Sequence, residues 1–428
     1  MTFLNRANTP KYKLIDKINI NKVSSDFLSN KTPIHVINAG SQDVVRIDFL
    51  FSAGTWYADK PIVASATNSL MNEGTKKHSS FQIAQHFDFY GAYISFSTDN
   101  DFASISVLTL NKNISPVLSF VEDMIKNSVF PEKELQMYTK KQKQKFTVES
   151  TKVKTLSRRK FKEVIYGKAH PYANYLEECD FDNVKIADIK KFFTKVYGAD
   201  NCRIFVAGKA HDGIIKEIET RFGKNDWMLK NKLLVPSYNF ETTQERIIYI
   251  EKTDAVQSAL QIGKRTINKL HEDYMGLQVL NTILGGYFGS RLMANIREEK
   301  GYTYGIGSML VSLKNAGYFV ISTEVGADVT QAAIKEIYLE IKKLQENLVS
   351  AKELQLVKNY ILGEFVRMFD GPFATLDSYR AISNYNLGYE YYEKYIETVK
   401  HITAKDMLEL ANKYLQQNSF YEVTVGKK

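Results

Sequence analysis

The chain has 428 residues of ordinary composition, with 44% hydrophobic and 25% charged residues, 8 Pro and 23 Gly. These values exclude collagen-like, low-complexity and wholly disordered proteins, and the length predicts two or three domains. Lys and Arg outnumber Asp and Glu by 57 to 48, giving a net charge of +9. An excess of that size does not by itself indicate a nucleic-acid partner.

No stretch of about 18 uninterrupted apolar residues occurs, and residues 1–20 carry polar and charged side chains where a signal peptide is apolar. Cys179 and Cys202 are too few for a disulfide framework and form no CxxC pair. The sequence therefore predicts no membrane association. It favours a cytoplasmic location, with a periplasmic one left open should the N-terminus have been trimmed.

In chain order, the first half predicts an alternating strand at residues 45–51 and a β-hairpin at 93–110 turning at 99–101. An amphipathic helix follows at 115–127, with Ser115 and Pro116 as its start signals. The tetrapeptide Lys133-Glu134-Leu135-Gln136 opens another helix. A polar helix then leads through residues 197–201 into a short apolar strand.

The second half predicts the same elements in the same order. An alternating strand lies at 256–262, a hairpin at 304–325 turns near 315–317, and a helix spans 328–344 with Asp328 as a possible N-cap. The tetrapeptide recurs as Lys352-Glu353-Leu354-Gln355, 219 residues after its first copy, and a final strand follows 414–418. An internal repeat of this length indicates two copies of one domain.

We therefore predict an α+β protein of two repeated domains, each a mostly antiparallel sheet with helices on one face. The expected boundaries are an N-terminal domain at residues 1–230, a linker at 231–245 and a C-terminal domain at 246–428. The linker is expected to lie within the polar stretch 224–245, which contains Pro236 and continues neither neighbouring pattern.

A more specific signal lies in residues 284–292, Leu-Gly-Gly-Tyr-Phe-Gly-Ser-Arg-Leu, followed by Arg-Glu-Glu-Lys-Gly-Tyr-Thr-Tyr at 297–304. This segment resembles the C-terminal domain of the M16 zinc metallopeptidases, the family of pitrilysin, insulin-degrading enzyme, mitochondrial processing peptidase and the cytochrome bc1 core subunits. The resemblance covers nearly the whole chain. It implies a duplicated fold of the LuxS/MPP-like metallohydrolase type.

Catalytic members of that family carry His-x-x-Glu-His a few residues before a Gly-Thr. Two His at i and i+4 bind one zinc, and the Glu activates the zinc-bound water. Counting back from Gly74-Thr75, this chain has Ser65, Asn68 and Ser69 at those positions. The family's third ligand, a Glu about 75 residues on, falls in residues 137–146, which contain lysines and no carboxylate. The resemblance thus implies no zinc in this chain.

The family's other contribution to the active site is retained. An Arg and a Tyr seven residues later hold the substrate backbone in M16 enzymes, and Arg297 and Tyr304 fit that spacing. A guanidinium can donate to a peptide carbonyl, and a phenol can donate to a developing oxyanion. A plainer interpretation has Arg297 complementing a helix dipole before Gly301 and Tyr304 as a buried strand tyrosine.

The resemblance implies a non-catalytic subunit of a heteromeric zinc endopeptidase. This chain would supply Arg297, Tyr304 and half of an enclosing chamber for peptides, while a partner subunit supplies His-x-x-Glu-His and zinc. A heterodimer, a heterotetramer and a homodimer remain open. The alternative is a structural or peptide-holding scaffold, similar to the bc1 core subunits, without proteolysis.

Other features favour plainer interpretations. His170 is expected to structure its loop rather than bind metal. The Gly285-Gly286 segment lacks the Gly-Lys-Ser/Thr of a phosphate loop. The basic run at 140–162 indicates a solvated helix face rather than nucleic acid, or a surface facing an acidic patch on the partner. On the predicted substrate edge strand, Ser95 and Phe96 stand where catalytic relatives have Asn-Ala, which leaves open whether the first half binds peptide.

Overall fold

A computed structural model describes residues 20–427 of the chain. The absence of a signal peptide, expected from residues 1–20, concerns residues that lie almost wholly outside the described range. Within that range, no helix is both long and apolar enough to cross a bilayer.

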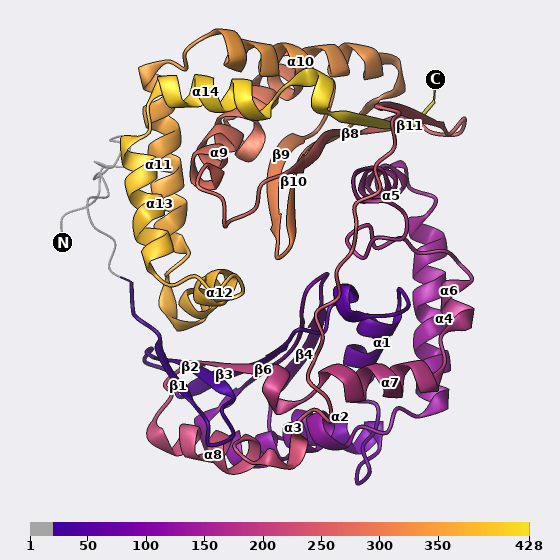
Figure 1. Cartoon of the computed structure of the whole chain (residues 1–428), viewed down its shortest axis with the longest axis vertical. Coiled ribbons are helices and arrows are strands. Elements are labelled where there is room, and N and C mark those ends of the chain that lie inside the picture. The colour runs from indigo at the N-terminus through magenta and orange to yellow at the C-terminus, as the bar shows by residue number, and fades with distance from the viewer. Residues whose placement is uncertain (1–19, 428) are drawn as a thin grey trace, which may run out of the picture.

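Two β-sheets form the framework, and their strands follow the same order (Figure 1). The first sheet runs β1-β2-β6-β3-β5-β4 and the second β7-β11-β8-β10-β9, so the second sheet repeats the first without β1. All neighbouring strands are antiparallel except β2 with β6 and β7 with β11, which are parallel. The strands are β1 Ser24–Phe27, β2 Pro33–Asn38, β3 Val44–Phe51, β4 Tyr93–Thr98, β5 Ala103–Leu110, β6 Cys202–Gly208, β7 Ile247–Glu251, β8 Gln257–Thr266, β9 Ile306–Leu313, β10 Ala316–Gly326 and β11 Tyr421–Gly426.

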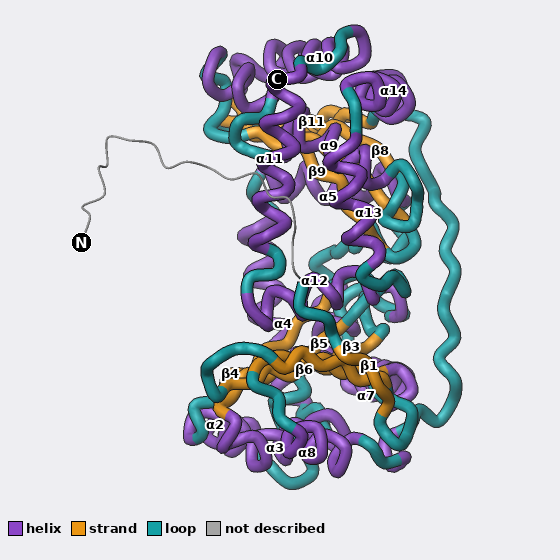
Figure 2. The backbone as a smooth tube through the Cα atoms, turned by 90° about the vertical axis from the view of Figure 1, so that its left-hand side faces the viewer, coloured by secondary structure: helices purple, strands orange, loops and turns teal. Residues whose placement is uncertain are grey.

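Helices cover the outer face of each sheet, with α2, α3 and α8 on the first and α10 and α14 on the second (Figure 2). This arrangement confirms the predicted duplicated α+β fold. The helices are α1 Val63–Ser69, α2 Ser80–Phe89, α3 Ile114–Asn127, α4 Glu132–Glu149, α5 Val153–Tyr166, α6 Asp180–Asn183, α7 Ile186–Val196, α8 Asp212–Phe222, α9 Tyr274–Asn281, α10 Thr330–Glu346, α11 Ala351–Arg367, α12 Gly371–Ser383, α13 Glu390–His401 and α14 Ala404–Tyr414.

The expected N-cap Asp328 is wrong, whereas Pro116 lies in the first turn of α3, as predicted. Each helix is preceded by a 3-10 turn, η2 (Asn111–Asn113) before α3 and η7 (Ala327–Val329) before α10, which moves the capping position. The N-cap residues of α3 and α10 are Asn113 and Val329. The Ser115 hydroxyl donates to the Glu217 carboxylate rather than capping α3. The correction preserves the repeat, because both halves use the same 3-10 start.

Each half contributes one helix to the inner face of the other half's sheet. Helix α5 packs on β8 and β11 of the second sheet, where the Phe161 and Tyr318 rings lie 6.2 Å apart. Helix α12, at the equivalent place in the second half, packs on β2 and β6 of the first sheet through the buried Leu376. This exchange interlocks the two halves.

Buried polar contacts reinforce the exchange. Asp48 on β3 is fully buried and forms ion pairs with Arg46 at 3.0 Å and with Arg380 of α12 at 3.1 Å. Near the turn of the β9–β10 hairpin, the Lys314 backbone N–H donates to Asp101. Burying a carboxylate costs free energy unless the group is paired and hydrogen-bonded, as Asp48 is.

The connection between η4 (Asn225–Trp227) and β7 contains no helix or strand and runs along one side of the molecule (Figure 2). It is held to the first half by two hydrogen bonds with Trp56. The Trp56 indole N–H donates to the Pro236 carbonyl at 3.1 Å, and the Tyr238 hydroxyl donates to the Trp56 carbonyl at 3.0 Å.

Candidate functional site

Two regions correspond to the site residues predicted from the sequence. The first is helix α1 with the facing part of α4, where the family's zinc ligands would lie. The second is the glycine-rich turn after α9 together with the segment that leads into β9. Figure 1 shows the first region in the lower half of the molecule and the second in the upper half.

Asn68 turns into the sheet and serves as a structural residue. Its side chain is fully buried, and its amide donates to the carbonyls of Ser97 at 2.9 Å and Ser104 at 3.2 Å, which face each other across β4 and β5. Its own oxygen accepts from the Tyr197 hydroxyl at 3.3 Å. An amide can satisfy this set of partners and a carboxylate cannot, because a carboxylate only accepts.

Tyr138 of α4 occupies the side of α1 where two histidines would be needed. Its hydroxyl lies near the side chains of Ser65 and Ser69, and burial raises the pKa of the phenol. Ser65 also donates to the Ile62 carbonyl at 3.0 Å. The two serine hydroxyls therefore face a neutral phenol.

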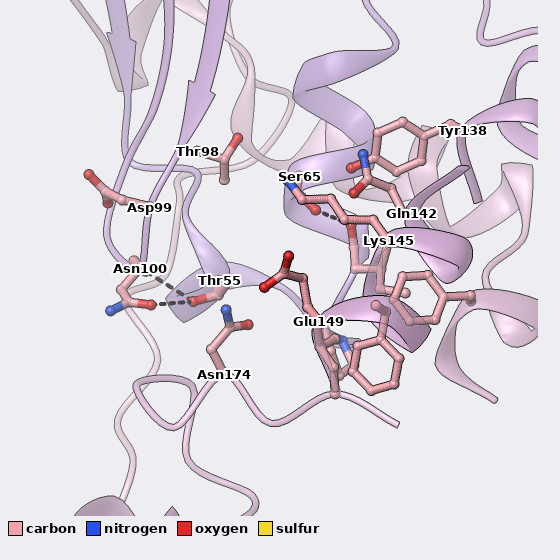
Figure 3. A pocket seen from close by; sticks show the side chains of 15 residues that line it. Thr55, Ser65, Thr98, Asp99, Asn100, Tyr138, Gln142, Lys145, Glu149 and Asn174 are labelled. Atoms are coloured by element: carbon pink, nitrogen blue, oxygen red, sulfur yellow. Dashed lines mark hydrogen bonds between the residues drawn. The ribbon is translucent and has the colours of Figure 1, made fainter. Parts of the chain in front are cut away.

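A cavity of about 280 Å³ opens beside this helix pair (Figure 3). Its lining includes Ser65, Tyr138, Gln142, Lys145 and Glu149. Glu149 was missed by the sequence reasoning, which looked only at residues 137–146. It lies one turn beyond that range and pairs with Lys152 at 2.7 Å, which lowers the pKa of its carboxyl.

The donors at this position do not fit zinc, which prefers thiolate, imidazole and carboxylate ligands. Serine hydroxyls, a phenol, an amide and a lysine surround α1, and two carboxylates, Asp99 and Glu149, lie at the cavity wall. Across residues 20–427, no three His, Cys, Asp or Glu side chains lie close enough to share a metal ion.

Four of the ten basic side chains at residues 140–162 form ion pairs within the chain. Lys143 pairs with Asp182 at 2.7 Å, and Lys160 pairs with Glu163 at 2.8 Å. The Arg159 guanidinium stacks on the Phe146 ring at 4.7 Å. These pairs support a solvated, internally paired helix surface.

His170 lies in an aromatic cluster, as a loop-structuring residue should. It is 4% exposed, and its Nδ1 accepts from the Tyr172 backbone N–H at 3.1 Å. Its ring stacks on Phe240 with centroids 4.9 Å apart. Burial, and secondarily the charge of Arg265, lower the pKa of His170 to about 4, so the imidazole is neutral at physiological pH.

The second region has an unusual backbone. Helix α9 continues into the π-helical segment η5 (Thr282–Gly286), and a second π-helical segment, η6 (Met293–Glu299), carries Arg297. Such segments are rare and occur frequently at functional sites. Gly285 permits close packing on β9, because a Cβ there would lie 2.6 Å from the Ser308 backbone nitrogen. Gly301 ends the second segment with φ of +68°, the conformation expected of a helix-terminating glycine.

Neighbouring side chains tether the segment that carries Arg297. Arg291 forms two parallel hydrogen bonds with Glu353 of α11, each 2.8 Å long. The Asn295 amide donates to Glu336 at 2.9 Å and to the buried Glu340 at 2.7 Å, both on α10. Bidentate and charge-assisted bonds of this kind fix orientation as well as adding stability.

Arg297 itself lies over the Phe288 ring, 4.7 Å from its centroid, and remains half-buried. It stands in the last turn of η6, so complementing the helix dipole remains a valid description of its charge. The stacking leaves the N–H groups at the edge of the guanidinium available to a ligand.

Tyr304 precedes β9 and is 93% exposed, the highest value among the large apolar and aromatic side chains of the described chain. The interpretation of Tyr304 as a buried strand tyrosine is therefore wrong. The adjacent Thr303 fixes the backbone by donating to the Glu324 carbonyl at 2.7 Å. Tyr304 thus projects into solvent from an anchored loop without contributing to packing.

Comparisons with known proteins agree with this architecture. Residues 35–170 match the family described as Insulinase (Peptidase family M16), and residues 183–361 match Peptidase M16 inactive domain. An uncharacterized zinc protease of Rickettsia felis is 25% identical over 405 residues, 90% of this chain and 93% of its own. A Helicobacter pylori protein named non-peptidase homolog YmxG is 22% identical over 326 residues, 74% of each chain.

A crystal structure titled as a peptidase M16 inactive domain from Pseudomonas fluorescens superimposes with a TM-score of 0.83 at 23% identity. It covers 95% of this chain and 98% of its own, which shows a shared fold. The two family matches together span most of the chain, one in each half. The chain belongs to the peptidase M16 family.

Proposed function

We propose that this chain is the non-catalytic subunit of a heteromeric, cytoplasmic M16 zinc endopeptidase. It contributes Arg297 and Tyr304 to peptide binding and forms half of the enclosing chamber. A partner subunit of the same family supplies His-x-x-Glu-His and zinc, as a heterodimer or heterotetramer.

One contrast carries the proposal. At the zinc position, Asn68 and Tyr138 are accounted for by contacts within the chain. At the other region, Tyr304 is 93% exposed on a loop anchored by its neighbours, and Arg297 stacks on a ring that is itself 62% exposed. An exposed aromatic residue and a positioned guanidinium, seven residues apart in one segment, are suited to holding an external peptide.

The chemistry fits an extended peptide near a partner's metal. The Arg297 guanidinium can donate to a substrate carbonyl, and the Tyr304 hydroxyl can donate to the oxygen on which charge develops during attack on the peptide bond. Such hydrogen bonds reduce the barrier most when they strengthen in the transition state. Removing one donor of this kind typically costs about 10²–10³ in kcat.

The test is reconstitution with the zinc-bearing subunit that co-purifies with the chain, followed by cleavage of an unstructured quenched-fluorescence peptide. Arg297→Ala and Tyr304→Phe are expected to reduce kcat/KM by at least about tenfold. The matched controls Arg367→Ala and Tyr360→Phe, which alter residues of α11, are expected to leave it unchanged. Unchanged turnover in both test variants would refute the role.

The scaffold alternative predicts a different set of results. A chain that only holds the complex together would assemble with its partner, and its loss would reduce complex mass without any dependence of turnover on Arg297 or Tyr304. Native mass spectrometry of the complex identifies the partner and its stoichiometry. Stoichiometric zinc in the purified chain alone would contradict the proposal.

A further inference from the structure

A second cavity, of about 460 Å³, adjoins the Arg297 region and has a charged side that the proposed function does not use. One wall is formed by the glycine-rich turn and by β9 and β10 of the second half. The opposite side is contributed by α5, the helix exchanged from the first half, through Lys154 and Arg158. The site therefore exists only because of the helix exchange.

The charges at this cavity are unbalanced. Lys154 pairs with Glu324 of β10 at 3.2 Å. Arg158 is exposed and has no ion pair or hydrogen bond within residues 20–427. One turn further along α5, the cation of Lys162 lies close enough to Arg158 to lower the pKa of the amine, after burial as the main cause. The helix thus presents two cations to the cavity, Lys154 and Arg158, against the single carboxylate of Glu324.

The opposite wall allows a peptide backbone to approach. The lining includes four residues that lack a side chain: Gly285, Gly286, Gly305 and Gly307. A Cβ built at Gly305 meets no atom within 4 Å, and at Gly307 the nearest atom is 3.4 Å away. Strand β9 is the edge of its sheet, so it has main-chain groups without a strand partner.

The cavity is continuous with the proposed peptide-binding residues. Phe288, on whose ring Arg297 lies, is part of its lining, and Gly305 directly follows Tyr304. A peptide held by Arg297 and Tyr304 and lying along β9 would pass the cavity mouth. Met293, Ile306 and Met309 add apolar surface suited to side-chain methylene groups.

We propose that this cavity binds a carboxylate of the peptide, with Arg158 as its ion-pair partner and the glycine wall accepting the peptide backbone. The inference rests on the proposed function. A guanidinium pairs with a carboxylate through two parallel hydrogen bonds. Glu324 at the wall repels a doubly charged group, which favours a carboxylate over a phosphate. The carboxylate belongs either to an Asp or Glu side chain or to a peptide C-terminus.

The test measures binding of peptides to the full-length chain by fluorescence anisotropy. The probes are fluorescein-labelled decapeptide libraries, each with Glu or Gln fixed at one position, prepared with amidated and with free C-termini. The wild-type chain is expected to prefer Glu over Gln about tenfold at one position in the amidated set. A preference for free over amidated C-termini, without a Glu preference, would identify the C-terminal carboxylate as the group bound.

Variants separate this inference from the proposed function. Arg158→Gln is expected to bring the ratio of the affinities for the Glu and Gln libraries close to one. It should leave the affinity for uncharged libraries unchanged. Arg158→Lys retains part of the preference, and the exposed Lys141→Gln is the charge-matched control. If Arg158→Gln leaves the preference intact while Arg297→Ala still weakens binding of every library, the carboxylate site is refuted and the peptide site stands. If no library binds, or if Arg297→Ala has no effect, the peptide site is refuted, and with it the cavity's role.

Discussion

Replacing Asn68 by Asp tests whether this residue is a structural substitute rather than a remnant of a catalytic Glu. The change alters one atom and leaves the side-chain shape almost unchanged. It removes both hydrogens that Asn68 donates to the Ser97 and Ser104 carbonyls, at 2.9 and 3.2 Å. It also places a carboxylate at a position with no exposed surface.

The expected loss follows from these contacts. Each buried acceptor left without its donor costs about 1–3 kcal/mol, and an unpaired buried charge adds to that cost. Asn68→Asp should therefore lower the free energy of unfolding by about 3–5 kcal/mol at pH 8. Burial against two carbonyl oxygens raises the pKa of the new carboxyl above its unfolded value of about 3.9. Stability is therefore retained below that value and lost as the pH rises through the folded pKa.

Urea denaturation at pH 4 and pH 8 measures both effects. The difference between wild type and Asn68→Asp should be small at pH 4, where a protonated carboxyl can still donate one hydrogen bond, and large at pH 8. The exposed Asn347→Asp is the control and should change stability by less than about 0.5 kcal/mol at either pH. Equal, pH-independent effects of the two substitutions would refute the structural role of Asn68.

Three further outcomes are expected. Gly285→Ala should lower the free energy of unfolding by about 1–3 kcal/mol, because its Cβ would collide with the Ser308 backbone, whereas Gly305→Ala, which has open space, should be tolerated in thermal denaturation. Tyr138→Phe removes a buried hydroxyl beside Ser65 and Ser69, so it should lower the free energy of unfolding by about 1 kcal/mol in urea denaturation and leave peptide affinity unchanged. His170 has its pKa lowered to about 4, so its contribution to stability is present above about pH 6.5 and lost as the pH falls toward 4, at up to about 1.4 kcal/mol per pH unit. His170→Asn should flatten this part of a pH-dependent unfolding curve, and an unchanged slope would show that His170 is not responsible.

The repeat could be predicted because both halves keep the alternation of their strands and the polarity of their helices. The hairpins at 93–110 and 304–325 occur as β4–β5 and β9–β10, and the repeated tetrapeptide lies at the start of α4 and α11. The sequence pattern could not show which sheet the apolar face of a helix packs against. The apolar faces of α5 and α12 predict burial, but amphipathicity does not say that each helix packs on the other half's sheet.

The same limit applies to the site. Family spacing correctly placed residues 65–69 on one helix, yet the partners of Asn68 are backbone carbonyls, which have no sequence signature. Tyr138 lies within residues 137–146, where the family spacing indicates only whether a carboxylate is present. The cavity that joins Arg158 to the glycine-rich turn depends on the helix exchange, so its residues are about 130 positions apart in the chain, and no local pattern connects them.

The two site regions differ in what the fold explains. At α1, every predicted zinc position is occupied by a residue with a role in the folded chain: Asn68 joins α1 to the β4–β5 hairpin, and Ser65 and Ser69 meet Tyr138. Restoring a zinc site would therefore require coordinated changes on α1, α4 and that hairpin. Around Arg297, by contrast, the tethers through Arg291 and Asn295 hold the segment without using Arg297 or Tyr304 at all. Packing accounts for the first region without a ligand and leaves the exposure of Tyr304 unexplained unless a ligand binds there.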